Sequence, residues 1–89
     1  KNLKSLRLGG NTAITNRGIE SLTNLTYLDI SFFNPGITND GLSNLKNLTT
    51  LVAYDNGMIT REVFFRLPKL VNYYYDVHWP KLHAHRSKL

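Results

Sequence analysis

Side chains suited to recognising another molecule recur along this sequence at a nearly constant interval. One such series consists of Arg7, Asp29, Val52 and Tyr74. Aromatic rings beside charged groups are typical of protein-binding surfaces, because rings bury large areas and charges fix the orientation of a partner. If the interval reflects a structural repeat, these four side chains form a column on one surface of the molecule.

Further aromatic and acidic residues lie close to each member of this series. The residues that we predict to contact a partner lie in or just after expected strands and are Arg7, Tyr27, Asp29, Phe32, Val52, Tyr54, Asp55, Tyr74 and Asp76. The alternative is that Arg7 and Asp29 only pair with each other across adjacent strands, while the tyrosines only cover apolar surface.

The sequence contains no arrangement of residues typical of an enzyme. No nucleophile with a base, paired carboxylates or phosphate-binding loop is recognisable, and Gly9-Gly10 reads as a turn. Cysteine is absent, which excludes thiolate chemistry. The histidines, His78, His83 and His85, lie in a basic segment where such residues are more often solvated than metal-bound. We therefore predict no catalytic, cofactor or metal site.

A motif of leucines followed by asparagine and Ile-Thr accounts for the interval. Its copies begin at Leu3, Leu25 and Leu48, and Leu70 begins a partial fourth, so the spacing is steady apart from one insertion in the second copy. In each copy a Leu-x-Leu stretch alternates apolar and open positions, which predicts a short strand with its apolar side chains in the core. Apolar residues at helical spacing follow the Ile-Thr pair. Each copy is thus predicted to form one coil of strand, turn and short helix.

Polar residues at fixed places in the copies are expected to satisfy backbone groups where the chain turns. The asparagines that follow the strands can bond to open backbone groups and form a ladder; they are Asn11 and Asn56, with Asn34 displaced by the insertion. The threonines that precede the helical segments are expected to be N-caps whose hydroxyls accept from free backbone N–H groups; they are Thr15, Thr38 and Thr60.

The spacing of the leucines, over Leu3 to about Tyr75, resembles the leucine-rich-repeat family. The Ile-Thr-x-x-Gly-Ile/Leu-x-x-Leu half is similar to the subclass found in F-box-associated and related bacterial or viral repeat proteins. The resemblance implies an α/β fold: a right-handed solenoid with a parallel concave sheet of about four short strands and short helices on the convex side. It also implies a protein–protein interaction module that uses the concave face, as the recognition part of a larger adaptor.

Two other functions remain open on the sequence. One is a structural repeat segment with no ligand of its own. The other is an extracellular recognition domain, if a signal peptide lies outside this sequence. The sequons at Asn24 and Asn47 recur because the repeat recurs, and they would be glycosylated only in an exported protein.

The copies are expected to occupy residues 1–78, as three full repeats and one partial repeat, with a C-terminal cap and basic tail at residues 79–89. Trp79-Pro80 is the expected cap of the core. The pattern is already running at Leu3, so we expect a C-terminal fragment of a longer array. Such a fragment would be able to self-associate through its open N-terminal repeat.

The distribution of charge argues against nucleic acid as the partner. The net charge is +5, of which Lys81, Arg86 and Lys88 supply +3, so only +2 remains for the whole of the preceding chain. No apolar run approaches the ~20 residues of a membrane span. The absence of cysteine favours the cytoplasm. The ending Ser87-Lys88-Leu89 matches a peroxisomal address if it is the native C-terminus.

Overall fold

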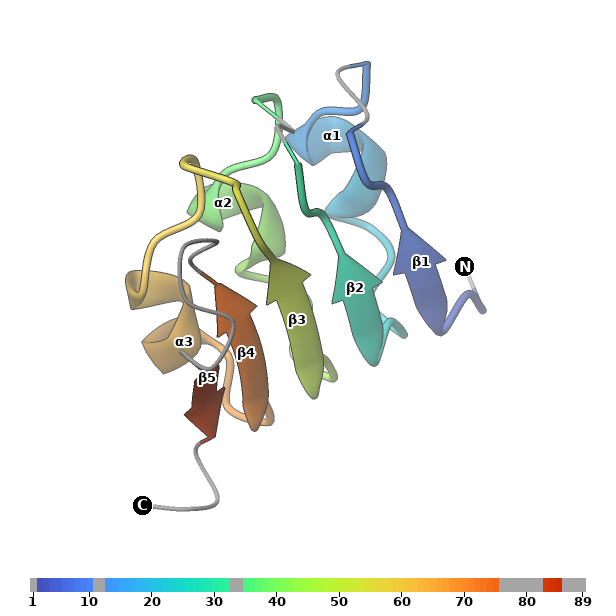
Figure 1. The fold of residues 1–89 in the computed structure, drawn as a ribbon. Coiled ribbons are helices and arrows are strands. Elements are labelled where there is room, and N and C mark those ends of the chain that lie inside the picture. The colour runs from blue at the N-terminus through green and yellow to red at the C-terminus, as the bar shows by residue number, and fades with distance from the viewer. Residues whose placement is uncertain (1, 11–12, 33–34, 76–82, 86–89) are drawn as a thin grey trace.

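The computed structural model describes residues 2–10, 13–32 and 35–75, and the backbone of residues 83–85. In these residues the chain alternates between strands and short helices (Figure 1). The elements in chain order are β1 (Ser5–Arg7), α1 (Asn16–Ile19), β2 (Tyr27–Asp29), α2 (Asn39–Leu42), β3 (Thr50–Ala53), α3 (Glu62–Arg66), β4 (Asn72–Tyr75) and β5 (His83–His85).

The strands β1 to β4 form a parallel sheet in which neighbours in sequence are neighbours in space. Leu6 pairs with Leu28, Leu28 with Leu51, and Leu51 with Tyr73, so equivalent residues of successive repeats lie side by side. The helices α1, α2 and α3 form a second layer on one face of this sheet (Figure 1). The predicted α/β solenoid is therefore confirmed. We call its units coil 1 (residues 3–24), coil 2 (25–47) and coil 3 (48–69).

The hydrophobic core lies between the sheet and the helices. Leu28 and Leu51 from the strands and Leu42 and Val63 from the helices are fully buried there. Strand residues on either side of these leucines are half-buried or exposed, which is the alternation expected of a short strand with one face in the core. The core positions assigned from the repeat are thus correct in coils 2 and 3, whereas in coil 1 Leu6 and Leu8 are only partly buried and Leu3 is exposed.

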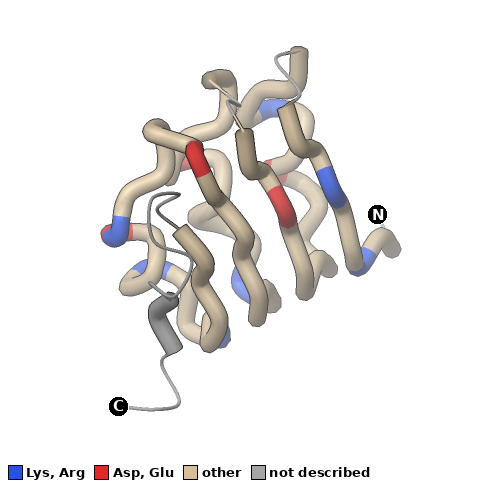
Figure 2. The backbone as a smooth tube through the Cα atoms, in the orientation of Figure 1, with Lys and Arg blue, Asp and Glu red and all other residues tan. Residues whose placement is uncertain are grey.

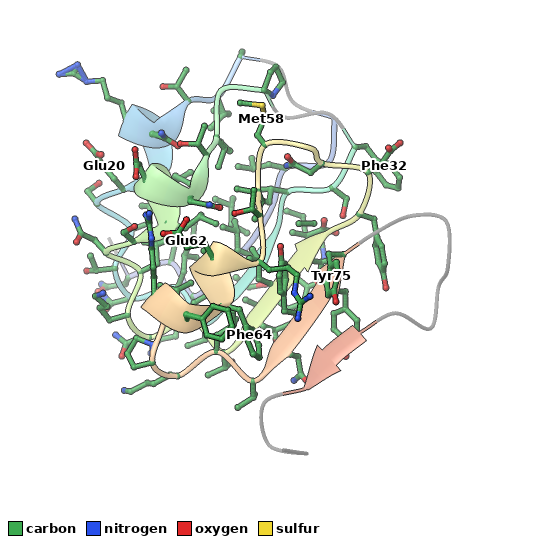
Figure 3. All side chains as sticks on the ribbon, turned by 90° about the vertical axis from the view of Figure 1, so that its left-hand side faces the viewer. Glu20, Phe32, Met58, Glu62, Phe64 and Tyr75 are labelled. Carbon is green, nitrogen blue, oxygen red and sulfur yellow. The ribbon has the colours of Figure 1, made fainter. Side chains whose placement is uncertain are left out.

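Aromatic side chains close the core at the coil 3 end. Phe64 stacks on Tyr73 with ring centroids 6.0 Å apart, and Tyr73 stacks on Tyr75 at 4.8 Å. These arrangements are favourable for aromatic pairs. Figure 3 shows Phe64 and Tyr75 on the α3 side of the molecule. The expected Trp79-Pro80 cap lies outside the described residues.

Residues His83–His85 form a fifth strand, whereas the sequence predicted a basic, solvated tail there. β5 pairs antiparallel with β4, with Asn72 opposite His85 and Tyr74 opposite His83. The sequence did not predict this strand, because His-Ala-His lacks the apolar alternation that identifies a half-buried strand.

The asparagine expected to satisfy backbone groups after a strand does so in coil 3. Asn56 is buried, its Nδ2 donates to the Ile30 carbonyl at 2.7 Å, and its Oδ1 accepts from the Met58 N–H at 3.0 Å. Because Ile30 belongs to coil 2, this side chain ties the turn of one coil to the strand of the previous one. The equivalent Asn11 and Asn34 lie outside the described residues.

The threonines were predicted to cap the helices, and in the first two coils the predicted N-cap positions are correct but the predicted bond to the hydroxyl is absent. Thr15 and Thr38 occupy the N-cap positions of α1 and α2 without a capping side-chain bond. Instead, Asn16 Nδ2 donates to Thr38 Oγ1 at 2.9 Å, and the Thr38 N–H donates to Asn16 Oδ1 at 2.9 Å. The amide therefore binds both groups of a threonine in the next coil.

The same pair of bonds recurs one coil further on. Asn39 Nδ2 donates to Thr60 Oγ1 at 2.7 Å, and the Thr60 N–H donates to Asn39 Oδ1 at 3.1 Å. The Thr60 hydroxyl also accepts a long bond of 3.4 Å from the Glu62 N–H, although Arg61 is the N-cap of α3. We call each two-bond contact an asparagine–threonine clamp. The clamps fix the helix layer of each coil to the next.

The sequon residues also have a structural role between coils. Asn47 Nδ2 donates to the Thr23 carbonyl at 3.1 Å, and the Thr49 hydroxyl donates to the Thr26 carbonyl at 3.0 Å. The Thr26 hydroxyl donates in the same way to the Lys4 carbonyl at 3.2 Å. The two sequon threonines therefore make the same contact with the preceding coil.

We expect Asn16→Ala to destabilise the protein by about 1–3 kcal/mol, because it removes both bonds of a clamp and leaves the half-buried Thr38 N–H without its acceptor. Urea denaturation followed by circular dichroism measures this change. Asn44→Ala is the matched control, since Asn44 is exposed after α2. Equal midpoints for the two variants would mean that the clamp does not contribute to stability.

Candidate functional site

One face of the sheet, opposite the helix layer, carries the predicted partner-binding residues; we call it the open sheet face. Arg7 pairs in register with Asp29, Asp29 with Val52, and Val52 with Tyr74. The column expected from the spacing therefore exists and runs across four strands. Arg7 is exposed and the other three side chains are half-buried.

The guanidinium group of Arg7 lies over an aromatic ring. Its Cζ is 5.4 Å from the ring centroid of Tyr27 on the neighbouring strand, within the range of a cation–π contact. No ion pair joins Arg7 to Asp29, although the two residues are opposite each other. The Arg7–Asp29 ion pair of the alternative interpretation is therefore absent. Among the described residues, no cation forms an ion pair with the carboxylate of Asp29.

Two tyrosines form an aromatic pair near the far end of the column. The rings of Tyr54 and Tyr74 are 6.4 Å apart between centroids and tilted by 37°. Partial desolvation raises the pKa of Tyr54, and the nearby Tyr74 and Asp29 raise it further. The Tyr54 phenol is therefore neutral at physiological pH and can offer its O–H to an acceptor on a partner.

Hydrogen bonds hold the backbone between Asp29 and Tyr54 in place. Asp29 Oδ1 accepts from the Ser31 N–H at 3.0 Å, and Ser31 Oγ accepts from the Tyr54 N–H at 3.0 Å. Ser31 occupies the position in coil 2 that Tyr54 occupies in coil 3, but only 1% of it is exposed. Its hydroxyl bonds within the protein, so Ser31 positions the surface and does not contribute to it.

Phe32 and Asp55 occupy equivalent turns beyond the ends of β2 and β3. Both adopt left-handed backbone angles, with φ of 66° and 55°, where coil 1 has Gly10 with φ of 69°. A bulky residue is strained in this region, in which glycine is preferred. Phe32 is nevertheless 58% exposed, and Figure 3 shows it on the opposite side of the molecule from Glu20 in the helix layer. An exposed ring held in a strained conformation is available for contact with a partner.

In the described part of the chain, two carboxylates of the helix layer are paired with a cation, whereas two carboxylates on the sheet side are not. On the helix layer, Arg66 forms ion pairs with Asp40 at 3.2 Å and Glu62 at 3.1 Å. On the sheet, within the part of the chain that the structure describes, Asp29 and Asp55 form no ion pair. Figure 2 shows acidic segments on β2 and just past β3, with a basic segment on β1. Unpaired carboxylates beside aromatic rings are suited to receive basic groups of a partner.

The remaining expectations concern Asp76, metals and membranes. Asp76, the last predicted contact residue, lies outside the described residues. Among the residues that are described, no group of three or more potential metal ligands occurs. The described helices are too short to cross a bilayer.

The sequence did not predict that Asn16 and Asn39 connect neighbouring coils. The sequence does contain a sign of this role, because each asparagine directly follows an Ile-Thr pair. In coil 3, Arg61 stands at the equivalent position. Their role depends on a neighbour in the next coil, which a helix considered alone does not reveal.

Comparison with known proteins agrees with the geometry. A family model described as a leucine-rich repeat matches residues 1–22 and again residues 21–46. No curated protein matches the chain, and no solved structure matches it. The two matches cover residues 1–46, just over half of the 89 residues, and they coincide with coils 1 and 2. With strands, helices and core repeating in step with these matches, the chain belongs to the leucine-rich-repeat family.

Proposed function

We propose that this protein is a protein-interaction module that binds its partner on the open sheet face. The in-register column of Arg7, Asp29, Val52 and Tyr74 across four strands carries the proposal. Leucine-rich repeats are commonly modules of this kind. On the helix layer, Asp40 and Glu62 are already paired with Arg66, so these two carboxylates are less suited than Asp29 to receive a basic group of a partner.

The side chains on this face define the chemistry of the partner. The tilted pair Tyr54 and Tyr74 offers ring faces and hydroxyls to an apolar or aromatic side chain. Asp29 would orient a basic side chain beside these rings, and Arg7 on β1 would orient an acidic one. A protein segment lying across the strands would meet these groups in sequence, with Phe32 at the rim.

The resemblance to the subclass found in F-box-associated proteins supports a finer proposal. On that basis we propose that the module is the recognition part of a larger adaptor. We further propose that it acts without catalysis and in the cytoplasm. The absence of cysteine is consistent with this location.

Capture of partners from a cell extract with matched baits tests the proposed function. We expect the wild-type chain and Asn44→Ala to retain the same protein, and Tyr54→Ala and Tyr74→Ala to lose it. Calorimetric titration of that purified protein should then show a loss of about 2 kcal/mol or more, roughly thirtyfold, for each tyrosine variant. Circular dichroism checks that the variants remain folded. Equal losses for Asn44→Ala, or loss only on deleting the basic tail, would place the binding site elsewhere.

A further inference from the structure

The coil 1 end of the solenoid is an incomplete copy of the interfaces inside it. β1 lies at the edge of the sheet. Leu6 and Leu8 are only partly buried, whereas their counterparts Leu28 and Ile30 in coil 2 have no exposed surface. Leu3 is 42% exposed, although its counterpart Leu25 is fully buried. Apolar side chains that are covered in the next coil are thus uncovered here.

One half of an asparagine–threonine clamp is present at this end. Thr15 is the counterpart of Thr38 and Thr60, each of which binds an asparagine of the preceding coil through its hydroxyl and its N–H. The backbone at Thr15 resembles that at Thr38, with φ of −124° and −123° and ψ of 178° and 179°. Among the described residues, none donates to the Thr15 hydroxyl or accepts from its N–H. Within the described part of the chain, the receiving half of the clamp is therefore formed and unfilled.

The space that the missing asparagine would occupy is also present. Gly41, in α2, is buried, and a Cβ on it would overlap the side chain of Asn16. Its counterpart Gly18, in α1, is exposed, and among the described residues a Cβ there would meet only the Ile14 side chain of its own coil at 3.5 Å. The absence of a side chain at Gly41 makes space for Asn16 of the preceding coil. At Gly18 the equivalent space contains no described side chain of another coil. In coil 3, where α3 begins one residue later, Val63 takes this position.

We propose that the coil 1 end is a docking surface for a further coil of the same repeat type, joined on the N-terminal side of Leu3. That coil presents an asparagine to Thr15 and Gly18 and covers Leu3, Leu6 and Leu8. The surface continues the coil 1–coil 2 and coil 2–coil 3 interfaces, which both contain an asparagine–threonine clamp. This inference is independent of what binds the open sheet face.

A second copy of this chain is a poorer occupant. Stacked head to tail, it would have to present coil 3, whose residue at the clamp position is Arg61 and not asparagine. Its β4 is moreover already paired with β5. The coil 3 end is thus unsuited to fill the coil 1 end of another molecule.

A chain extended by one coil tests the proposal. A copy of residues 3–24 is inserted before Leu3, so that the copied Asn16 faces the original Thr15. We expect the extension to raise the melting temperature. A double-mutant cycle between the copied Asn16→Ala and the original Thr15→Ala should show at least fivefold coupling in the unfolding equilibrium. The Asn16 and Thr38 cycle in the unextended chain is the reference. An unchanged melting temperature, or purely additive effects, would overturn the proposal.

Substitution of the glycines provides a second readout. In the unextended chain, Gly18→Ala should leave the melting temperature unchanged or raise it, whereas Gly41→Ala should lower it. In the extended chain, Gly18→Ala should become as damaging as Gly41→Ala. The same effect of Gly18→Ala in both chains would contradict the proposal. If it already destabilises the unextended chain, and does so more at high protein concentration, a second copy fills the end and the proposed occupant is wrong.

Discussion

Leu51→Ala is expected to remove about 2–5 kcal/mol of stability, a large part of what a domain of this size possesses. Leu51 is fully buried in the middle of the sheet, paired on one side with Leu28 and on the other with Tyr73. Truncation leaves a cavity that two neighbouring strands cannot close without losing their register. Leu28→Ala should have an effect of the same size.

Equilibrium urea denaturation of the purified chain measures these losses, with Asn44→Ala as the surface control. Both leucine variants should unfold at far lower urea than the control. If Leu51→Ala were as mild as Asn44→Ala, the core between sheet and helices would not hold the fold, and the repeat register would be wrong.

The second large effect is expected in alkaline solution and centres on Tyr73. Its side chain is 1% exposed and its hydroxyl donates to the Thr60 carbonyl at 3.3 Å. Burial, assisted by Tyr75, raises the pKa of Tyr73 to about 12 from an ordinary 10.0. The folded state therefore favours the neutral phenol. Its contribution is complete below about pH 10 and is lost as the pH rises from about 10 to 12, a total of about 2–3 kcal/mol.

Denaturation of the wild-type chain and of Tyr73→Phe at a series of pH values from 8 to about 12 isolates this residue. Phenylalanine loses the bond to Thr60, which costs about 1 kcal/mol at neutral pH, but it cannot ionise. The stability difference between the two proteins should shrink and then reverse as the pH rises. Parallel curves across the whole range would mean that Tyr73 does not ionise with a raised pKa.

The repeat made most of the fold predictable. Because the leucines recur at a nearly constant interval, the sequence predicted which side chains are buried, which strands are neighbours, and that Arg7, Asp29, Val52 and Tyr74 align. Each of these conclusions needs only period-two alternation within a strand and stacking of equivalent positions.

Contacts between coils were less predictable. Thr38 precedes a helical segment, so its sequence context favours an N-cap, yet its hydroxyl accepts from Asn16 of the preceding coil. Arg7 pairs in register with Asp29 but lies over the ring of Tyr27. In both cases the sequence indicates the position of a side chain, while its choice between two nearby partners depends on the distances in the stack.

Four of the residues predicted to contact a partner, Arg7, Asp29, Val52 and Tyr74, align across the sheet as expected, and their role in binding is still a prediction. The structure shows that Phe32 and Asp55 share the left-handed backbone conformation of Gly10. The spacing of the residues in the sequence does not reveal this conformation. The three residues share this backbone conformation because they occupy equivalent turns, although glycine is the residue type that usually adopts it.

The most direct test of the central claim is a nuclear magnetic resonance titration of the isotope-labelled chain with its captured and purified partner. We predict that the largest shift changes will map to Asp29, Val52, Tyr54 and Tyr74 on the open sheet face, and that the amides of α1 and α2 will change little. Shift changes confined to the helix layer or to residues 86–89, with Tyr54 and Tyr74 unaffected, would contradict the account.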